Sequence, residues 1–360
     1  MLLALAAGLL SLFQPHATLR RLALPDPPLP ALPALQAPAW SAAYDGVLLT
    51  GKDLSMPRPT GSTVKLLTAL VAVRDPALVP DRVITVSAAQ ARAAAFGYAQ
   101  GNSELSLTPG ERLTIHDLLL ALLLPSGDDA ADLLAAHSTG GTAVFLRRMG
   151  TLAAKLRLGP TQFGDPSGLS AQDRITPAGA IRLALAALAD PRVADIVRLR
   201  TARLSNGQVV KNLNRLLWTY PGAIGMKTGS TVPAGYVLIF ASRRKGALAI
   251  GSVMHEQGFP QTFRDAAAIL DYAFQAGATR TLPAGTAVAV VHWPFGLRQT
   301  VRLASPLFLG PPGAAAPRVL LANARAIAWG GSVGSIRAGG RSSALRTSAL
   351  PPWLQLWLGL

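Results

Sequence analysis

Serine and lysine side chains stand at positions of this chain that could carry acyl-transfer chemistry. Ser62 and Lys65 are three residues apart, so a helix would place the hydroxyl and the amine on the same turn. Ser126 follows a long apolar segment, and Lys227-Thr228-Gly229 begins a predicted strand. A serine becomes a good nucleophile when an adjacent base takes its proton, and an uncharged lysine can be that base. These residues predict a serine–lysine site that needs no histidine.

Lysine is scarce in this chain, which makes its positions informative. There are six lysines against 28 arginines, and two of the six are Lys65 and Lys227. Arginine stays protonated in proteins, whereas a buried lysine can lose its proton and act as a base. Taken alone, Ser62 and Lys65 would fit equally well an N-capping serine and a lysine that reaches solvent. The three motifs together favour catalysis.

The motifs must be positioned by a helical block and by strands on either side of it. Pro125 breaks an apolar helix just before Ser126, and strands stand at both ends of the block. This order predicts an α+β fold with helices packed on an antiparallel sheet. We expect helices over 62–73, 114–124, 128–136, 142–157, 176–189 and 263–274, and strands over 42–50, 83–86, 234–242 and 247–254.

Composition narrows the function without choosing it. Half of the 360 residues are apolar and 14% are charged, which excludes disorder over most of the chain. The chain has no cysteine, so disulfides, thiolate catalysis and cysteine-ligated metals are excluded, and its five histidines have no metal-ligand spacing. The net charge of +16 comes from dispersed arginines without a nucleic-acid-binding motif, so we expect no nucleic-acid partner. Attraction to an anionic cell envelope fits that charge equally well.

The chain divides into five expected segments. Residues 1–17 have an apolar core of secretory-signal length but no Lys or Arg before it, and they predict export to the periplasm or the outer face of the cytoplasmic membrane. Proline-rich 18–40 predicts an extended tether, 41–277 a catalytic domain and 278–350 a small β-rich domain. The apolar tail 351–360 contains two tryptophans and predicts either a membrane contact or an edge of the β domain.

Longer stretches around the motifs resemble one family. Pro59-Thr60-Gly61-Ser62-Thr63-Val64-Lys65, Pro125-Ser126-Gly127-Asp128-Asp129 and Met226-Lys227-Thr228-Gly229-Ser230 are similar to the three motifs of serine D-alanyl-D-alanine carboxypeptidases. These are the low-molecular-weight penicillin-binding proteins of peptidase family S11. The resemblance covers about residues 40–275 and is faint over 280–360. It implies a β-lactamase/transpeptidase-like domain, a peptidoglycan pentapeptide substrate, acylation by β-lactams, and no cofactor or metal.

The resemblance also implies a role for each motif residue. Ser62 would be the acylated nucleophile and Lys65 its general base. Ser126 would relay a proton toward the leaving D-alanine. The enzyme would remove the terminal D-alanine of peptidoglycan stem peptides, with a DD-endopeptidase as the alternative.

The remaining assignments concern the substrate's terminal carboxylate and the oxyanion. Lys227 and Thr228 would hold the carboxylate, within the Lys227-Thr228-Gly229 motif. The backbone amides of Ser62 and Ser230 would form the oxyanion hole. Arg264 matches an arginine near the carboxylate subsite of the family, and otherwise it is a solvated helix residue.

One position departs from the family pattern. The second motif normally ends in asparagine, and this chain has Asp128 there. An ionised aspartate only accepts hydrogen bonds, and between two lysines it would stabilise their charged forms and weaken the base. We expect reduced or retuned turnover, with a peptidoglycan- or penicillin-binding relative of little turnover as the alternative. Asp128 could instead cap the following helix, which would bring Asp129 nearer the site.

Two other hydrolase classes fit less well. A class A β-lactamase needs a glutamate after the second motif, and none lies between Asp129 and Lys227. The Gly330-x-Ser332-x-Gly334 pattern matches the nucleophile elbow of α/β-hydrolases, but no Asp, Glu or His follows Ser332. The sequence therefore favours slow release of a penicilloyl enzyme and excludes the α/β-hydrolase interpretation.

Overall fold

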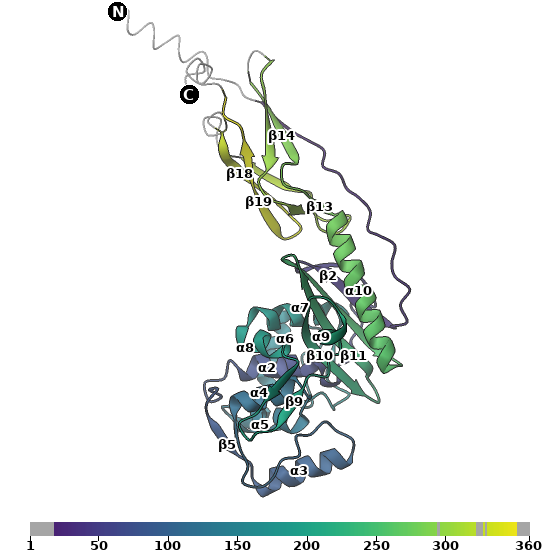
Figure 1. Cartoon of the computed structure of the whole chain (residues 1–360), viewed down its shortest axis with the longest axis vertical. Helices are drawn as coiled ribbons and strands as arrows, with labels where there is room; N and C mark the ends of the chain where they lie inside the picture. Colours follow the sequence, from purple (N-terminus) through teal and green to yellow (C-terminus); the bar gives the residue numbers. More distant parts are fainter. Residues whose placement is uncertain (1–17, 294–295, 322–326, 328–329, 351–360) are drawn as a thin grey trace, which may run out of the picture. The chain divides into compact units, whose positions relative to one another are not determined.

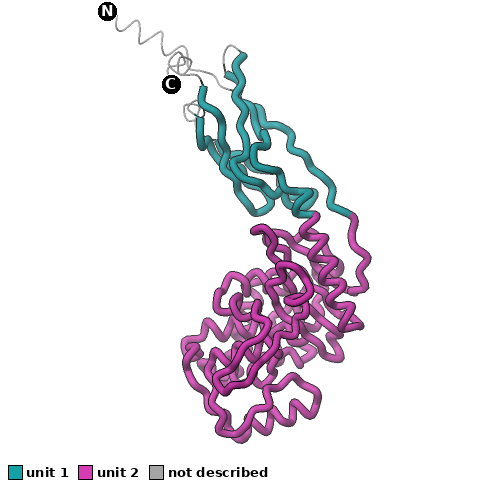
Figure 2. The backbone as a smooth tube through the Cα atoms, in the orientation of Figure 1, with its two compact units in different colours: residues 1–30, 276–360 teal, residues 31–275 magenta. Residues whose placement is uncertain are grey.

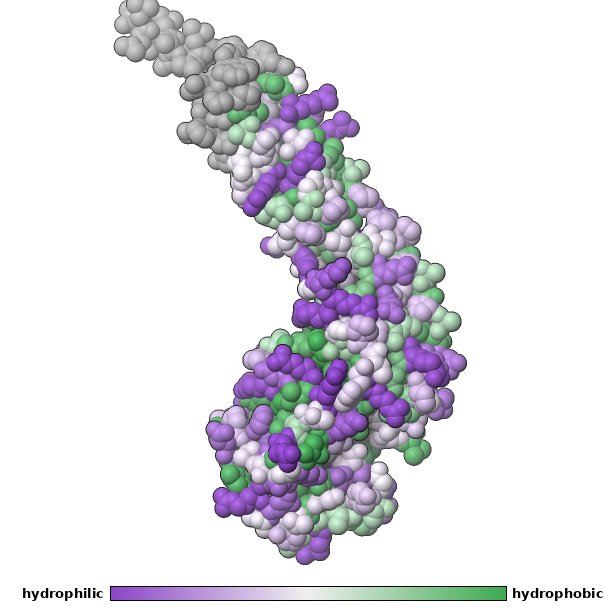
Figure 3. Space-filling model, viewed as in Figure 1, coloured by the Kyte–Doolittle hydropathy of each residue, from purple (hydrophilic) through white to green (hydrophobic). Residues whose placement is uncertain are grey.

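The computed structural model describes residues 18–293, 296–321, 327 and 330–350. The chain forms two compact units, shown in Figure 2. The larger unit covers 31–275, and the smaller one combines 1–30 with 276–360. All the predicted site residues belong to the larger unit. On the face of that unit seen in Figure 3, hydrophilic residues are interspersed with apolar ones.

The larger unit is built on a five-stranded antiparallel sheet in the order β10-β11-β12-β2-β3. Two tight hairpins set its register, and each has a non-glycine residue and then a glycine at positive φ. Asp45 and Gly46 (φ 49° and 83°) connect β2 to β3, and Lys245 and Gly246 (φ 48° and 83°) connect β11 to β12. Such turns match the right-handed twist of the paired strands. The strands are β2 (Ala39–Tyr44), β3 (Val47–Lys52), β10 (Ala223–Thr231), β11 (Gly235–Arg244) and β12 (Ala247–Glu256).

A helical cluster packs against this sheet, with α10 running along its other side in Figure 1. The centre of the cluster is α2, whose eight residues are all buried. Because α2 is apolar around most of its circumference, its neighbours can surround it. The helices are η1 (a 3₁₀ turn, Gly61–Val64), α2 (Lys65–Ala72), α3 (Ala88–Ala99), α4 (Ile115–Leu123), α5 (Asp128–His137), α6 (Gly141–Leu156), α7 (Pro177–Ala189), α8 (Pro191–Val197), α9 (Leu216–Thr219) and α10 (Phe259–Thr279).

Helix starts in the cluster follow local sequence signals. The Thr114 and Asp117 side chains each accept a hydrogen bond from the other's backbone N–H and form a capping box at the start of α4. Thr176 caps α7, with Pro177 in its first turn. Short two-stranded ladders link the helices: β4 (Arg58–Pro59) with β7 (Arg174–Ile175), β5 (Val83–Thr85) with β6 (Arg112–Thr114), and β8 (Thr201–Arg203) with β9 (Val209–Lys211).

The smaller unit has its own apolar core and a six-stranded antiparallel sheet in the order β1-β14-β15-β19-β18-β17. Its strands are β1 (Thr18–Arg21), β14 (Ala287–His292), β15 (Arg298–Leu303), β17 (Arg318–Leu321), β18 (Gly331–Ala338) and β19 (Arg341–Thr347), with β13 (Thr281–Leu282) paired to β16 (Leu307–Phe308). The expected tether over 18–40 was wrong at its start. Residues 18–21 form the edge strand β1, because their backbone pairs with β14 although all four residues are exposed.

The α+β class is confirmed, with an antiparallel sheet, a helical cluster and a β-rich C-terminal region. The helix expected over 62–73 is divided into η1 and α2. The expected export signal, 1–17, and the apolar tail, 351–360, lie outside the described residues. Among the described residues, no helix combines the length and apolar character needed to span a membrane.

Candidate active site

Ser62 lies on η1 at the edge of a cleft of about 100 Å³. The same cleft is lined by Ser126, which precedes α5, and by Thr228, Gly229 and Ser230 of β10. The structure thus brings the three sequence motifs to one cavity, from segments that are more than 60 residues apart in the chain. This convergence is what a shared acyl-transfer site requires.

Lys65 is fully buried and its amine faces Ser62. Lys65 Nζ lies 2.8 Å from Ser62 Oγ, 2.5 Å from Asp128 Oδ1 and 2.9 Å from the Ser167 carbonyl oxygen. Three acceptors match the three N–H donors of an ammonium group. This is the arrangement expected after Lys65 has taken a proton. It fixes the amine one hydrogen bond away from the hydroxyl that it would activate.

Asp128 is held from two sides. Its Oδ1 accepts from Lys65, and its Oδ2 accepts from the Ser103 amide at 3.0 Å, while the Asp128 amide donates to the Ser103 carbonyl at 2.6 Å. The Asp128 side chain is 5% exposed, so the ion pair with Lys65 is buried. The interpretation of Asp128 as a helix cap with Asp129 nearer the site was wrong. Gly127 is the N-cap of α5, and Asp128 is the residue that contacts Lys65.

Ser126 has an unusual backbone conformation. Its φ is +73°, in the left-handed region that favours glycine, and the residue is 3% exposed. Such a conformation in a non-glycine residue costs about 1–3 kcal/mol and persists where the surroundings impose it. Here the Gly127 amide donates to the Ala121 carbonyl at 2.9 Å, which fixes the turn between α4 and α5. The turn places the Ser126 residue in the wall of the cleft.

Lys227 approaches the site from the sheet. A register shift between Ala223 and Met226, with Met226 at φ +85°, precedes Lys227 on the edge strand β10. The Lys227 side chain is 1% exposed, and its Nζ donates to the Thr228 carbonyl at 3.1 Å. Burial lowers the pKa of Lys227 well below its ordinary value; the charge of Lys65 acts in the same direction, and the carboxylate of Asp128 opposes both.

Two glycines let η1 and β10 approach backbone to backbone. A Cβ on Gly229 would lie 2.8 Å from the Ser62 amide nitrogen, and a Cβ on Gly61 would lie 3.0 Å from the Ser230 amide nitrogen. Gly61 also has φ +47°. Neither position has room for a side chain without a shift of the backbone. The close approach brings the Ser62 and Ser230 amides to adjoining segments of the cleft, where an oxyanion hole would use them.

Comparison with known proteins agrees with this geometry. The family model of D-alanyl-D-alanine carboxypeptidases, peptidase family S11, matches residues 39–258. The chain belongs to this family. It is therefore a serine-type carboxypeptidase by family, with the β-lactamase/transpeptidase-like fold that the sequence predicted.

Individual relatives match about two thirds of this chain. A D-alanyl-D-alanine carboxypeptidase of Streptomyces sp. (strain K15) is 33% identical over 245 residues, 64% of this chain and 83% of the relative. The carboxypeptidase DacB2 of Mycobacterium tuberculosis is 34% identical over 260 residues, 69% of this chain and 86% of the relative. The crystal structure of the Streptomyces K15 DD-transpeptidase is similar with a TM-score of 0.62 at 32% identity, covering 68% of this chain and 99% of that one.

In this family member, Arg264 does not line the cleft. Its side chain is exposed on α10 and donates to Gln261 Oε1 at 2.8 Å from Nε. Its match to the arginine near the family's carboxylate subsite stays a prediction. The cleft wall on that side is aromatic and apolar instead, formed by Leu213, Tyr236 and Phe259 together with Phe263.

The aromatic wall was not predicted from the sequence. Phe259 and Phe263 are one helical turn apart and their rings are in edge contact, with centroids 5.1 Å apart. Tyr236 lies beside Phe259 at 5.7 Å between centroids. The spacing of the two phenylalanines would have indicated a shared helix face. It could not indicate that this face borders the cleft rather than the core.

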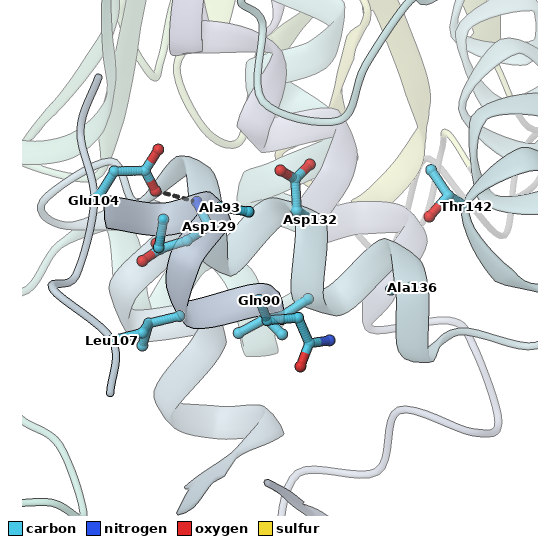
Figure 4. Close-up of a pocket in the computed structure, with 10 residues that line it drawn as sticks. Gln90, Ala93, Glu104, Leu107, Asp129, Asp132, Ala136 and Thr142 are labelled. Atoms are coloured by element: carbon cyan, nitrogen blue, oxygen red, sulfur yellow. Dashed lines mark hydrogen bonds between the residues drawn. The ribbon is translucent and has the colours of Figure 1, made fainter. Parts of the chain in front are cut away.

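An acidic cavity lies on the other side of the segment that holds Asp128. It has a volume of about 220 Å³, and its lining includes Glu104, Asp129 and Asp132, as Figure 4 shows. Burial, and then the charge of Asp129, raise the pKa of Glu104 to about 8. Burial also raises the pKa of Asp129 to about 6, against the amides of Leu105 and Ala130 that donate to it. In the described part of the chain, no group of three or more His, Cys, Asp or Glu residues is arranged to hold a metal ion.

Proposed function

We propose that this protein is a DD-carboxypeptidase that removes the terminal D-alanine of peptidoglycan stem peptides through an acyl-enzyme on Ser62. The observation that carries the proposal is the 2.8 Å contact between Lys65 Nζ and Ser62 Oγ at the edge of the cleft. Membership of the carboxypeptidase family supports the same substrate class. β-Lactams would acylate the same serine, because they present a carbonyl and a carboxylate in the same relation.

In the first half-reaction, uncharged Lys65 takes the proton of Ser62 as Oγ bonds to the carbonyl carbon of the penultimate D-alanine. The carbonyl oxygen becomes an oxyanion, which the amides of Ser62 and Ser230 stabilise. The C–N bond then breaks, and the proton passes through Ser126 to the departing amine. Lys227 and Thr228 hold the carboxylate of the leaving residue.

The second half-reaction returns the enzyme to its starting state. Water attacks the ester carbon, and the free Lys65 amine takes the water proton as general base. The bond to Ser62 Oγ breaks, Oγ regains a proton, and the shortened peptide leaves. Asp128 Oδ1 lies 2.5 Å from Lys65 Nζ in this structure, so the base works beside a carboxylate, and this pairing is the feature that Asp128→Asn would test.

The experiment is mass spectrometry of penicillin-treated protein together with D-alanine release from a soluble pentapeptide. We expect one covalent adduct on Ser62 and release of one D-alanine per peptide. Ser62→Ala should lose both signals while its thermal unfolding stays close to that of the wild type. An adduct on another residue, or full labelling of Ser62→Ala, would contradict the assignment.

Two other reactions that the same site could catalyse can be tested with the same purified protein. The D-alanyl-D-alanine endopeptidase of Escherichia coli is 31% identical over 190 residues. The similar crystal structure from Streptomyces K15 is that of a DD-transpeptidase. Cleavage of a cross-linked muropeptide would indicate an endopeptidase, and D-alanine exchange with an added amine would indicate a transpeptidase. Labelling without any release would indicate a penicillin- or peptidoglycan-binding relative, which Asp128 would explain.

We also propose that the protein acts outside the cytoplasm, in the periplasm or at the outer face of the cytoplasmic membrane. The short apolar core of residues 1–17 supports export, and the substrate class requires it. The two tryptophans of 351–360 support a peripheral membrane contact. Cell fractionation of the full chain, with and without residues 351–360, tests both points.

A further inference from the structure

A long stretch of the larger unit has no negative side chain. Between Asp195 and Glu256 the sequence has nine Lys and Arg residues and no Asp or Glu. Part of this stretch forms β8, β9 and α9, of which β9 and α9 are labelled in Figure 1. Acids outside the stretch pair with two of these cations, Arg198 and Arg244, and Lys227 is buried in the active site. Arg200, Lys211 and Arg215 are exposed, so they are available to an anionic ligand.

The cations gather around an exposed tryptophan. Trp218 on α9 is 41% exposed. The Arg200 guanidinium lies 5.9 Å from the centre of the indole and donates its Nε–H to the Leu217 carbonyl at 2.9 Å, and Lys211 Nζ lies 5.3 Å from the same ring. An aromatic face attracts cations at such distances and holds them in place. We call the surface formed by Arg200, Lys211, Arg215 and Trp218 the basic ridge.

The ridge is continuous with the active-site cleft. The Arg215 guanidinium lies 4.6 Å from the ring centre of Phe259, and Phe259 lines the cleft beside Ser230. Leu213, between Lys211 and Arg215 in the chain, lines the cleft as well. A chain that leaves the cleft past Phe259 therefore meets Arg215 first, and then the cations around Trp218.

None of the three ridge cations forms an ion pair with another described residue. All three are exposed. Arginine binds carboxylates through two parallel hydrogen bonds, so a ridge with two arginines and a lysine fits a ligand that carries several carboxylates.

We propose that the basic ridge is an accessory binding surface for the carboxylate-bearing peptide stems of polymeric peptidoglycan. This proposal rests on the proposed function, because a stem peptide bound in the cleft brings neighbouring stem peptides of the same polymer to the ridge. The ridge adds a preference for polymer over small substrates: it binds parts of the wall that never enter the cleft. Exposed ion pairs are individually weak and screened by salt, so the effect comes from several contacts along one strand.

The test variant is Arg200→Gln combined with Lys211→Gln, which removes two ridge charges away from the cleft. The matched control is Arg243→Gln with Lys245→Gln, an equal charge change on the exposed β11–β12 hairpin within the same acid-free stretch. The probes are purified peptidoglycan sacculi, sacculi whose carboxyls have been amidated, and a soluble pentapeptide. Binding is measured by co-sedimentation of full-length protein at low and high salt, and turnover by D-alanine release.

We expect the ridge variant to bind native sacculi roughly three- to tenfold more weakly than the wild type, as two exposed ion pairs would allow. It should release D-alanine from the soluble pentapeptide at the wild-type rate, and its penicillin labelling should be unchanged. Wild-type binding should fall to the level of the variant on amidated sacculi and at high salt. The control pair should behave as the wild type in every assay.

Several results would overturn the proposal. Equal binding of the ridge variant, the control variant and the wild type to native sacculi would show that the ridge makes no contact with the wall. Equal losses in the two variants would show a general charge effect. Binding of the ridge to phosphatidylglycerol vesicles but not to sacculi would assign it to a membrane instead. Failure of penicillin labelling in the wild type would contradict the proposed function alone. The co-sedimentation of the ridge and control variants would still test the ridge.

Discussion

Asp128 and Asp129 are adjacent in the chain but lie in opposite electrostatic settings. Asp128 faces the cleft, where the Lys65 ammonium is 2.5 Å away and the Ser103 amide donates to the second oxygen. Asp129 faces the acidic cavity, whose lining includes Glu104 and Asp132 but no Lys or Arg. Both are buried. The comparison shows that two neighbouring carboxyls with similar burial can face opposite surroundings, a cation on one side and further carboxyls on the other.

One short segment connects the two settings. Residues 103–105 and 128–129 are joined by four hydrogen bonds, which we call the clasp. The amides of Ser103 and Leu105 donate to the Asp128 and Asp129 carboxylates, the Asp128 amide donates to the Ser103 carbonyl, and the Asp129 amide donates to Glu104 Oε2. The clasp therefore joins the wall of the cavity to the backbone that holds Asp128 against Lys65.

The largest effect should come from removing the charge of Asp128, the carboxylate that faces the cleft. Asp128→Asn removes the counter-charge of Lys65 and leaves the Ser103 amide facing a group that cannot accept from both sides. We expect penicillin acylation at neutral pH to rise on the order of tenfold, a change of about 1.4 kcal/mol in activation free energy. Stopped-flow or fluorescent-penicillin labelling measures the rate.

The same substitution should lower stability. Breaking a buried ion pair costs about 3–5 kcal/mol, and the asparagine oxygen that still accepts from Lys65 should reduce the loss to about 2 kcal/mol. Asp129→Asn, the same chemical change one residue on, is the control and should leave acylation unchanged. Equal acylation rates in the wild type and Asp128→Asn would refute the view that this aspartate weakens the base.

The second effect concerns the acidic cavity and is the pH dependence of stability that Glu104 causes. The pKa of Glu104 is about 8 in the folded protein against an ordinary value of 4.5, so the folded state binds more protons than the unfolded state between these values. Stability therefore falls as pH rises from about 4.5 to 8. Glu104→Gln still accepts from the Asp129 amide but carries no charge, and should be more stable than the wild type at pH 8 by on the order of 1 kcal/mol after solvent screening.

Thermal unfolding from pH 4.5 to 8.5 measures this difference. The two proteins should have similar stability at the acid end and separate as pH rises. Glu111→Gln is the control, because Glu111 is outside the cavity and hydrogen-bonds Thr108 and Asn206 at the surface. Parallel pH profiles for the wild type and Glu104→Gln would show that Glu104 is not the group that loses its proton.

The sequence predicted the cleft better than the cavity for physical reasons. Ser62 and Lys65 are local: three residues on one turn must be neighbours, and the structure places their polar atoms 2.8 Å apart. Lys227 comes from a distant strand, so only resemblance to a family could bring it to the same site. Arg264 rests on the same route; its side chain is exposed and bonded to Gln261, and its part in binding the carboxylate stays a prediction.

The clasp and the acidic cavity escaped prediction because they depend on a loop. Residues 103–105 have no periodic pattern, and hydrogen bonds between their backbone and two side chains 24 and 25 residues away leave no local signal. β1 was missed for a related reason. Its four residues are exposed, and an edge strand held by backbone pairing does not need the apolar alternation that identifies a half-buried strand.

The smallest effect concerns the turn that leads into both aspartates. Ser126 is held at φ +73°, where glycine has no steric penalty. Ser126→Gly should relieve strain of about 1–3 kcal/mol but add freedom to the unfolded chain worth about 0.4–1 kcal/mol, for a net gain of about 1 kcal/mol. Ser126→Ala keeps the strain and should gain nothing. Both variants lack the hydroxyl, so both should slow penicillin acylation to a similar degree.

The pair therefore separates chemistry from geometry at one residue. Denaturant unfolding gives the stability of each variant, and penicillin labelling gives its rate. A stabilised but slow Ser126→Gly would show that the left-handed turn is maintained at a cost in order to present the hydroxyl to the cleft. If the glycine variant were less stable than the alanine variant, the conformation would not be strained. The turn before α5 would then be an unstrained conformation for serine, and no strain at Ser126 would be needed to position Asp128.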